Sequence, residues 1–566
     1  MNILGVTHPV SYNSAACILI NGKLIAFAEE ERFNRIKHSI HFPANKSVDY
    51  CLKKAGLTLK DIDYIAIGYD KFSNVLRSDL VGKFLGVQKR INTSDLIEDI
   101  KKKENQKIFS IFLSAVRYFI NYYQGFSRLP FNISDKRIIY VRHHIAHCAS
   151  AFFFSPFDKA CIISADGGGG QEAGLLAVGK GKEIKVINSI PSIDSLGNLY
   201  SDFTELLGFK KHDGEGKVMG LSAYGNKNAK LFPFVSFKNG LAKIDHQKMN
   251  KFLVRIKKKL KKDPLYKENA NLAASLQKTL EKSYLYMGEY LYKKTGIRNF
   301  CLAGGVSLNC LANSRLLNSS FVENIFVQPV SSDAGTALGA ALEVYVKKTN
   351  KRPKFTLKHV YYGPEYKNEE ILKIIKKCGI SSFKKYRNIE KIVAKLLAKG
   401  NIIGWFQGRM EVGPRALGNR SILVDPSKKG MKDKLNEKVK GREPWRPFAP
   451  SILEEYTDEI LLDVKDSPFM ILESKVKKEG LQKISQATHV NETVRPQTVS
   501  KKTNLRYWKL INEFRKMTKI PALLNTSFNL SGEPIVCSPQ DAISTFYRSK
   551  IDYLVLGDYL ISKKQK

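Results

Sequence analysis

The chain contains 566 residues, and its 93 Lys and Arg residues against 53 Asp and Glu residues give a formal net charge of +40. Hydrophobic residues make up 43% and charged residues 26% of the chain, which excludes a disordered, collagen-like or membrane-embedded protein. No apolar stretch is long enough to span a bilayer and no signal peptide is visible, so we expect no membrane partner. At about 150 residues per domain, the length predicts two to four domains.

The eight cysteines are scattered along the chain, and none forms a C-x-x-C pair. Several lie in apolar runs, which predicts buried thiols in a reducing compartment and therefore a cytoplasmic protein. Lysine occurs in dense runs such as 257–262 and 101–103, without interleaved aromatic residues. Solvated lysine faces explain the charge better than a dedicated nucleic-acid surface, although nucleic acid stays open as a partner. The oligomeric state also stays open.

Two segments with the same pattern indicate an internal duplication. The first has apolar strands at 2–6, 15–20 and 23–30. The second has apolar strands at 160–166, 173–179 and 183–190. Asn21-Gly22 predicts a type I′ hairpin turn in the first segment, and the glycines 167–170 predict a loop in the second. Two such units facing one another are typical of the duplicated actin-like (ASKHA) ATPase fold, an α/β architecture.

The remaining pattern predicts an α/β continuation and a second α/β domain. A long amphipathic helix at 272–295 precedes a strand at 299–305, and a further helix opens at 331–333. Residues 346–356 are polar and basic, which predicts a linker between domains at 1–350 and 357–566. The second domain mixes strands with helices. Its predicted strands lie at 401–406 and 553–557, and its helices at 369–377 and 390–399. Lys-rich insertions are predicted at about 76–130 and 226–268.

Four residues have the chemistry of a metal site. His143 and His147 lie four positions apart, so on a helix they share one face, whereas His144 points about 100° away. Asp166 ends an apolar strand and Asp333 opens a helix, positions at which α/β folds present ligands to a cleft. Two imidazoles and two carboxylates suit Fe²⁺, Mn²⁺ or Zn²⁺. A pair of core histidines and a simple helix cap at Asp333 stay open as alternatives.

Glycine-rich segments offer backbone amides to an anion. The run 167–170 and the Gly304-Gly305 turn after a strand both have this character, with a flexible turn or close packing as the alternative. Glu215 and Lys217 lie in a glycine-bordered loop that would suit phosphate or ribose contacts. These segments are candidates for a nucleotide site.

The second domain contains the densest group of cations. These residues lie in glycine- and proline-rich sequence with few acids nearby: Arg415, Arg420, Lys440, Arg442, Arg446 and Arg495. Asn525, Ser527 and Asn529 follow an apolar strand. Because a buried unpaired guanidinium is costly and arginine binds phosphate with two hydrogen bonds, the group predicts a site for an acyl phosphate or polyphosphate. Structural ion pairing is the alternative.

Nine motifs occur in order along nearly the whole chain. They are AEEERFNRIKHS, HHIAHCASAF, GEGKVMGL, AGGVSLN, SSDAGTALGAAL, VGPRALGNRSIL, REPWRPFAPS, RPQTV and NTSFNLSGEPIV. On these motifs the chain resembles the O-carbamoyltransferase family of the nodulation-factor and antibiotic type. The resemblance implies a first domain similar to the metal-binding, actin-like subunit of the tRNA threonylcarbamoylation system. It implies a YrdC-like second domain, a twisted-sheet α/β fold that forms carbamoyl adenylate.

The resemblance also implies an activity. ATP and carbamoyl phosphate would form carbamoyl-AMP, and the carbamoyl group would pass to an acceptor hydroxyl on a sugar or secondary metabolite. The implied metal ligands are His143, His147, Asp166 and Asp333, with iron as the usual metal and Mg²⁺ for ATP. The implied nucleotide-binding residues are Glu215, Lys217, Gly304, Gly305 and Asn309. The implied residues for carbamoyl phosphate and the adenylate are Arg415, Lys440, Arg446, Arg495, Ser527 and Asn529.

One departure from the family pattern concerns the catalytic base. Many relatives have His-Asp where this chain has Tyr12-Asn13, so His8 and Lys37 are the catalytic candidates that remain. Two other functions stay open. A tRNA-modifying carbamoyl or threonylcarbamoyl transferase would explain the charge, and a plain actin-fold ATPase would leave residues 357–566 without a role.

Overall fold

The computed structural model describes residues 1–9, 11–40, 42–70, 124–169, 172–443, 445–463 and 466–563. Most of the predicted insertion at 76–130 lies outside these residues. The insertion at 226–268 forms the hairpin β9–β10 (Val235–Lys238 and Leu241–Ile244) and the helix α10 (His246–Lys257). Phe232 and Phe234 from this insertion are buried in the core of the first domain, so the insertion packs against the fold.

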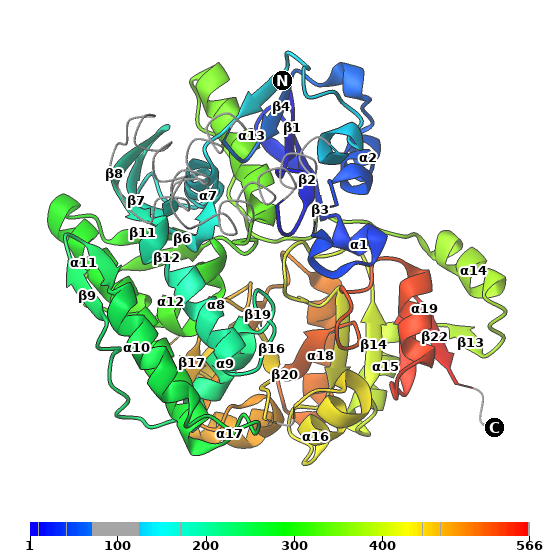
Figure 1. The fold of residues 1–566 in the computed structure, drawn as a ribbon. Coiled ribbons are helices and arrows are strands. Elements are labelled where there is room, and N and C mark those ends of the chain that lie inside the picture. The colour runs from blue at the N-terminus through cyan, green and yellow to red at the C-terminus, as the bar shows by residue number, and fades with distance from the viewer. Residues whose placement is uncertain are drawn as a thin grey trace.

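The first domain contains two five-stranded sheets with the same topology (Figure 1). In chain order the first sheet consists of β1 (Asn2–Val6), β2 (Ala15–Ile20), β3 (Lys23–Glu29), β4 (Tyr64–Ile67) and β5 (Ile138–Tyr140). The second consists of β6 (Lys159–Gly169), β7 (Glu172–Lys180), β8 (Glu183–Pro191), β11 (Asn299–Ala303) and β12 (Asn324–Val327). Each has three antiparallel strands followed by two that add in parallel. The predicted actin-like duplication is confirmed.

Two predicted turns have different outcomes. Asn21 and Gly22 have φ of 50° and 78°, which is the geometry of the predicted type I′ turn. The prediction that residues 167–170 form a loop is wrong for its first three residues, because β6 continues through Gly169. A methyl group on Gly169 would overlap the ring of His143. Glycine is therefore needed at residue 169 so that this histidine fits beside the strand.

Two helices lie between the sheets and hold them together. The helix α7 (His143–Phe152) contacts β6, β7 and β11, and α13 (Ala334–Thr349) contacts β1, β2 and β4. The helices also pack against each other, at a point where a methyl group on Gly339 would overlap the carbonyl oxygen of Ala146. This close packing fixes the N-terminal ends of both helices in the space between the sheets.

Further helices cover the outer faces. In the described part of the first domain these include α1 (Glu31–Asn34), α2 (Asn45–Ala55), α8 (Leu196–Leu206), α9 (Glu215–Leu221), α11 (Lys267–Thr295) and α12 (Cys310–Leu317). The helix predicted at 272–295 is thus confirmed and begins five residues earlier. Leu357 and Val360 follow α13 and are buried in the core of the first domain. The domain boundaries at 350 and 357 stay predictions.

The second domain is built on one twisted, mixed sheet of eight strands. Its order is β13 (Phe383–Lys385), β22 (Tyr559–Ser562), β21 (Tyr553–Leu556), β14 (Ile403–Phe406), β15 (Arg420–Val424), β20 (Ala522–Ser527), β16 (Ala449–Leu453) and β19 (Gln497–Val499). The short strands β17 (Ser474–Lys475) and β18 (Thr493–Val494) form a separate pair. The helices are α14 (Asn368–Lys377), α15 (Ile389–Ala398), α16 (Met431–Leu435), α17 (Lys478–Ile484), α18 (Leu505–Thr518) and α19 (Pro539–Tyr547). The predicted second α/β domain is confirmed.

Alternate residues of the central strands enter two different cores. On one face Trp405 and Leu423 pack with residues of α15 and α18. On the other face Phe406 and Ile422 pack with residues of α14, α16 and α19. This period of two is expected for a sheet that helices cover on both sides. Within the described ranges no helix is both long enough and apolar enough to cross a membrane.

The close approach of α7 and α13 predicts a stability effect. We expect Gly339→Ala to lower the free energy of unfolding by about 1–3 kcal/mol, as is typical for overpacking a core. Gly216→Ala is the matched control, since its added methyl group meets no atom within 4 Å. It should change the free energy by less than about 1 kcal/mol in the same urea titration. Equal effects of the two substitutions would contradict this account of the helix pair.

Candidate functional site

The two histidines of α7 converge with two carboxylates. The Nε2 atoms of His143 and His147 are 3.2 Å apart, and His147 Nε2 lies 3.3 Å from Asp166 Oδ2. Asp333 Oδ1 lies 3.7 Å from His143 Nε2 and 3.9 Å from His147 Nε2. One ligand atom from each of the four residues lies within 4.8 Å of the others. This convergence favours an ion-binding site over a pair of core histidines.

Neighbouring backbone groups orient these ligands. The N–H groups of Gly167 and Gly305 donate to Asp166 at 2.6 and 2.7 Å, and the Gly68 carbonyl oxygen lies 3.2 Å from His143 Nδ1. Asp333 occupies the N-cap position of α13, yet its side chain accepts no capping hydrogen bond. The alternative of simple helix capping is therefore wrong, and the carboxylate is free to face the histidines.

The third histidine of α7, His144, turns away from the site. His144 Nδ1 lies 3.2 Å from the hydroxyl of Ser164, and its Nε2 lies 3.0 Å from the carbonyl oxygen of Glu172. The predicted orientation of His144 is confirmed, because both of its ring nitrogens are used within the core.

The electrostatics of this group favour the binding of a cation. Burial, helped by the charge of Asp166, raises the pKa of Asp333 well above its usual range. Burial also lowers the pKa of His143, with further contributions from His147 and His144. Burial alone would raise the pKa of Asp166, but the hydrogen bond and charge of His147 lower it. Two imidazole nitrogens and two carboxylate oxygens therefore fit a divalent ion such as Fe²⁺, Mn²⁺ or Zn²⁺.

One large cavity extends between the two domains, with a volume of about 890 Å³. Its first-domain wall includes Asp166 and Asp333. Its second-domain wall includes Arg415, Lys440, Arg446, Arg495, Ser527 and Asn529. Two of the four predicted metal ligands thus line the same cavity as the predicted anion-binding residues.

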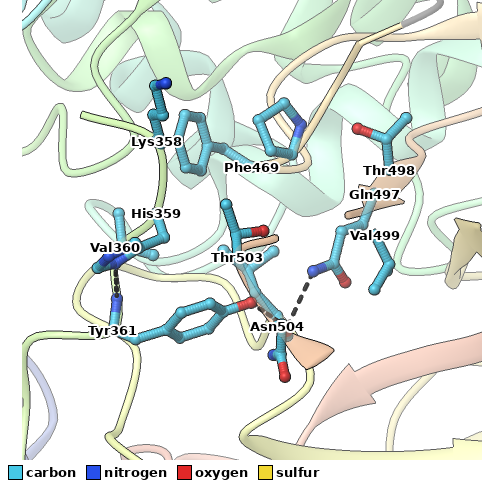
Figure 2. A pocket seen from close by; sticks show the side chains of 12 residues that line it. Lys358, His359, Val360, Tyr361, Phe469, Gln497, Thr498, Val499, Thr503 and Asn504 are labelled. Atoms are coloured by element: carbon cyan, nitrogen blue, oxygen red, sulfur yellow. Dashed lines mark hydrogen bonds between the residues drawn. The ribbon is translucent and has the colours of Figure 1, made fainter. Parts of the chain in front are cut away.

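A second pocket lies beside Tyr361, Phe469 and Asn504, as Figure 2 shows. Its volume is only about 10 Å³. A cavity of this size holds about one water molecule, so it is not a candidate ligand site.

The guanidinium groups of Arg415, Arg446 and Arg495 have few counter-charges. Within the described part of the chain, Arg415 and Arg495 form no ion pair, and their Nε atoms are buried without a hydrogen-bond partner. Burial and the charge of Arg495 lower the pKa of Arg415 to about 9. Arg446 has one partner, Glu443 at 3.8 Å. Most of this positive charge is therefore uncompensated, as an anionic ligand requires.

Lys440 lies between the predicted polar residues of the neighbouring turn. Its Nζ donates to the carbonyl oxygen of Ser527 at 2.5 Å and to Asn529 Oδ1 at 2.8 Å. Burial, followed by the charges of Arg442 and Arg446, lowers the pKa of Lys440 well below its usual range. The three residues thus form one network at the second-domain end of the cavity.

Two other arginines of the predicted cationic group have different positions. Arg420 is fully buried, donates to the carbonyl oxygens of Gln407 and Pro364 at 2.7 and 3.1 Å, and lies over the ring of Phe406. The interpretation of Arg420 as part of the anion site is therefore wrong, because backbone carbonyl oxygens use its guanidinium and it does not line the cavity. Arg442 lines the cavity.

Glu215 and Lys217 both line the cavity, but each already has a partner. Glu215 Oε1 accepts hydrogen bonds from the Ser201 hydroxyl at 2.6 Å and from the N–H of His212 at 2.8 Å. Lys217 Nζ forms an ion pair of 3.0 Å with Glu443 of the second domain. Their nucleotide-binding role stays a prediction.

The glycine turn and the helix after it are also occupied by protein contacts. Gly304 has φ of 84° and packs against the backbone of Ala165. The N–H of Gly305 donates to Asp166 at 2.7 Å, so this amide orients one of the predicted metal ligands. The side chain of Asn309 caps α12 and exchanges hydrogen bonds with Gln277 at 2.8 and 3.0 Å. Contact of these residues with a nucleotide stays a prediction.

The two catalytic candidates lie in different surroundings. His8 is 1% exposed, its ring centroid lies 4.5 Å from that of Tyr69, and burial lowers its pKa to about 3. His8 is not one of the described residues that line the cavity. Lys37 lines the cavity and forms an ion pair with Asp213. Lys37 is therefore better placed than His8 to meet a ligand.

Sequence reasoning missed His38 and Asp213. His38 Nε2 lies 3.3 Å from Asp213 Oδ1, and its Nδ1 lies 2.8 Å from Oδ1 of Asn13. All three line the cavity. His38 follows Lys37 directly, and Asp213 lies in the HDGEGK segment, so both residues stood in segments already singled out. Their separation of 175 residues left no local pattern that pairs them.

Comparison with known proteins gives consistent matches over almost the whole chain. Residues 2–342 match the family described as carbamoyltransferase N-terminus, and residues 394–563 match carbamoyltransferase C-terminus. Nodulation protein NolNO of Sinorhizobium fredii is 38% identical over 575 residues, which covers 100% of this chain and 81% of that protein. Nodulation protein NolO of Bradyrhizobium diazoefficiens is 42% identical over 434 residues, covering 75% of this chain and 79% of that protein.

Solved structures resemble part of the chain. Full-length HypF in its phosphate- and nucleotide-bound form is 14% identical, with a TM-score of 0.37. The match covers 62% of this chain and 56% of that chain.

The convergence of the four ligands predicts metal binding that depends on His147. We expect His147→Ala to weaken Mn²⁺ or Zn²⁺ binding to the metal-free protein by at least about 100-fold, because a direct ligand is lost. Isothermal titration calorimetry measures the affinity. His144→Gln is the matched control, since His144 lies on the same helix and faces the core, and its affinity should stay near that of the unchanged protein. Equal loss in both variants would contradict the site.

The lowered pKa of Lys440 predicts a pH effect on anion binding. An anion beside the amine favours its charged form and returns its pKa toward the usual value near 10.4. Between the lowered and the usual pKa, the complex therefore holds more protons than the free protein, and affinity falls as pH rises.

Calorimetry with inorganic phosphate, in buffers of different ionisation enthalpy, measures this proton uptake. Lys440→Met should remove it. Uptake that is equal in both proteins would show that another group titrates.

Proposed function

Because the chain belongs to the carbamoyltransferase family and is a carbamoyltransferase, we propose that it uses ATP and carbamoyl phosphate to carbamoylate an acceptor hydroxyl. The second domain would form carbamoyl-AMP, and the first domain would transfer the carbamoyl group. The single observation that supports this division is the common cavity of about 890 Å³. Its two walls differ in chemistry, with the carboxylates of Asp166 and Asp333 on one and the guanidinium groups of Arg415, Arg446 and Arg495 on the other.

The uncompensated cations suit the first half-reaction. Carbamoyl phosphate would lose its phosphate to water, and the carbamate oxygen formed would attack the α-phosphorus of ATP, from which pyrophosphate leaves. Arg415, Arg446 and Arg495 would hold the phosphate groups. Lys440 would lie between these phosphate groups and the turn that contains Ser527 and Asn529. A cavity between the two domains would limit the contact of the intermediates with bulk water. Preorganised positive charge is the most effective way to stabilise such transition states.

The first-domain end of the cavity suits the second half-reaction. The acceptor oxygen would attack the carbamoyl carbon, its proton would leave, and AMP would depart as the C–O bond to phosphate breaks. A divalent ion held by the four ligands, which we propose to be iron, would supply Lewis acidity toward the carbamoyl oxygen or the phosphate. Mg²⁺ would accompany ATP. Lys37 lies at the same cavity and would contact the reacting groups.

The acceptor and the cellular setting are further parts of the proposal. A sugar or secondary-metabolite hydroxyl fits the relatives, two of which are named as nodulation proteins. All eight cysteines are unpaired and only Cys378 is exposed, which supports a reducing cytoplasmic environment. A plain actin-fold ATPase would leave the carbamoyltransferase match at 394–563 without a role.

Release of pyrophosphate that depends on carbamoyl phosphate tests the division of labour. We expect Arg446→Ala to lower this release by at least about 100-fold, because a residue that stabilises transition-state charge is lost. His147→Ala should keep the release within about threefold, since it alters the other centre.

The measurement is coupled pyrophosphate detection with and without carbamoyl phosphate. Equal loss of pyrophosphate release in both variants would contradict two separate centres. Pyrophosphate release that does not depend on carbamoyl phosphate would contradict the first half-reaction.

A further inference from the structure

A cluster of buried charges lies where the two domains meet. It begins at the end of β3 and continues into α1, which lies between the first sheet and the second domain (Figure 1). Glu29, Glu31 and Arg32 are 5%, 7% and 4% exposed. Arg32 forms ion pairs of 2.7 Å with both glutamates. The cluster carries one negative charge in excess, because two carboxylates face a single guanidinium.

The cluster binds the backbone of one residue of the second domain, Gly413, through the two peptide units that flank it. Arg32 Nη2 donates to the carbonyl oxygen of Gly413 at 2.8 Å. The N–H of Gly413 donates to Glu29 Oε2 at 3.0 Å. Both hydrogen bonds involve a charged partner and are buried, which makes them stronger than hydrogen bonds between neutral groups. They therefore fix the position of Gly413 relative to the first domain.

The backbone conformation and the close surroundings of residue 413 both require glycine. Its φ of 98° lies in the region that favours glycine, and an added methyl group would meet the Pro329 carbonyl oxygen at 3.1 Å. On the second-domain side, Glu411 Oε1 accepts hydrogen bonds from the N–H groups of Leu417 and Asn419 at 2.8 and 2.7 Å. The loop from 411 to 419 is thus held at its ends by its own domain and in its middle by the other domain.

This loop contains Arg415, which lines the cavity and forms no ion pair with any residue that the structure describes. Arg415 follows Gly413 by two residues, so a shift of the backbone at Gly413 moves the guanidinium. Buried ion pairs add little stability relative to apolar residues, which makes stability a poor reason for this cluster. Positioning of a charged side chain that meets a ligand is the role that the contacts support.

We propose that Glu29 and Arg32 of the first domain are positioning residues for Arg415, so that carbamoyl phosphate binds fully only when the two domains are docked. This proposal rests on the proposed function of Arg415. Glu31 extends the cluster toward the other end of the cavity, since its Oε2 accepts the N–H of His38 at 2.5 Å. The first domain therefore takes part in the half-reaction of the second.

A double-mutant cycle tests the positioning role, with the KM for carbamoyl phosphate in pyrophosphate release as the readout. We expect Arg32→Gln to raise this KM by about tenfold, and the KM for ATP by less than about twofold, since coupled neighbours interact on this scale. In an Arg415→Gln background, Arg32→Gln should change the KM by less than about twofold, because there is no guanidinium left to position. The same factor in both backgrounds would overturn the proposal.

Two further variants separate positioning from folding. Glu29→Gln keeps the shape of the side chain and should raise the same KM, so it carries the test if Arg32→Gln does not fold. Arg352→Gln removes a half-buried guanidinium that pairs with Asp158 and donates to Phe152, outside the cavity wall, and should leave both KM values unchanged.

The outcomes also distinguish this proposal from the proposed function. If Arg415→Gln changes the KM and neither first-domain variant does, the positioning role alone is overturned. If Arg415→Gln has no effect, both are overturned.

Discussion

Like charges lie close together at both ends of the interdomain cavity. At one end Asp166 and Asp333 face each other across two histidines, and at the other Arg415 and Arg495 have no acidic partner among the described residues. Each arrangement costs free energy of folding, because burial disfavours a charge that nothing neutralises. Natural proteins keep such costs at functional sites, where a ligand or ion supplies the opposite charge. The remaining structure serves to hold these two groups in place.

The duplicated sheets explain how the first group is held. The helices α7 and α13 lie between the sheets, so their N-terminal ends project the histidines and Asp333 into one space. The strand β6 adds Asp166, and its glycines leave room for the ring of His143. Small residues at these contacts are thus as important to the site as the ligands, because a single methyl group would displace a ring or a helix.

Local patterns predicted much of the fold and of the site. Alternating apolar residues and the Asn-Gly turn located the strands, and the spacing of His143 and His147 predicted a common helix face. The lack of nearby acids singled out Arg415 and Arg495, which line the cavity and form no ion pair with a described residue. The same argument failed for Arg420, which backbone carbonyl oxygens satisfy. Every residue has a backbone carbonyl group, so the sequence does not indicate which of them accept a hydrogen bond from a side chain.

Contacts between distant residues were beyond local patterns. The contact of His38 with Asp213 joins segments separated by 175 residues. The hydrogen bond from Arg32 to Gly413 joins segments separated by 381 residues. Likewise the N–H of Gly305 binds Asp166. The strand–glycine–helix pattern identified an available amide, and only the tertiary structure shows which group it binds. Long-range polar contacts of this kind depend on topology, which periodicity alone does not determine.

Retention of the activated intermediate tests the central claim, a common cavity for activation and transfer, most directly. The protein is incubated with ¹⁴C-carbamoyl phosphate and α-³²P-ATP in the absence of acceptor and then passed rapidly through a desalting column. The account predicts that both labels elute with the protein in equal amounts, since carbamoyl-AMP stays in the cavity. Protein that carries neither label, or carries the carbon label without the phosphorus label, would contradict it.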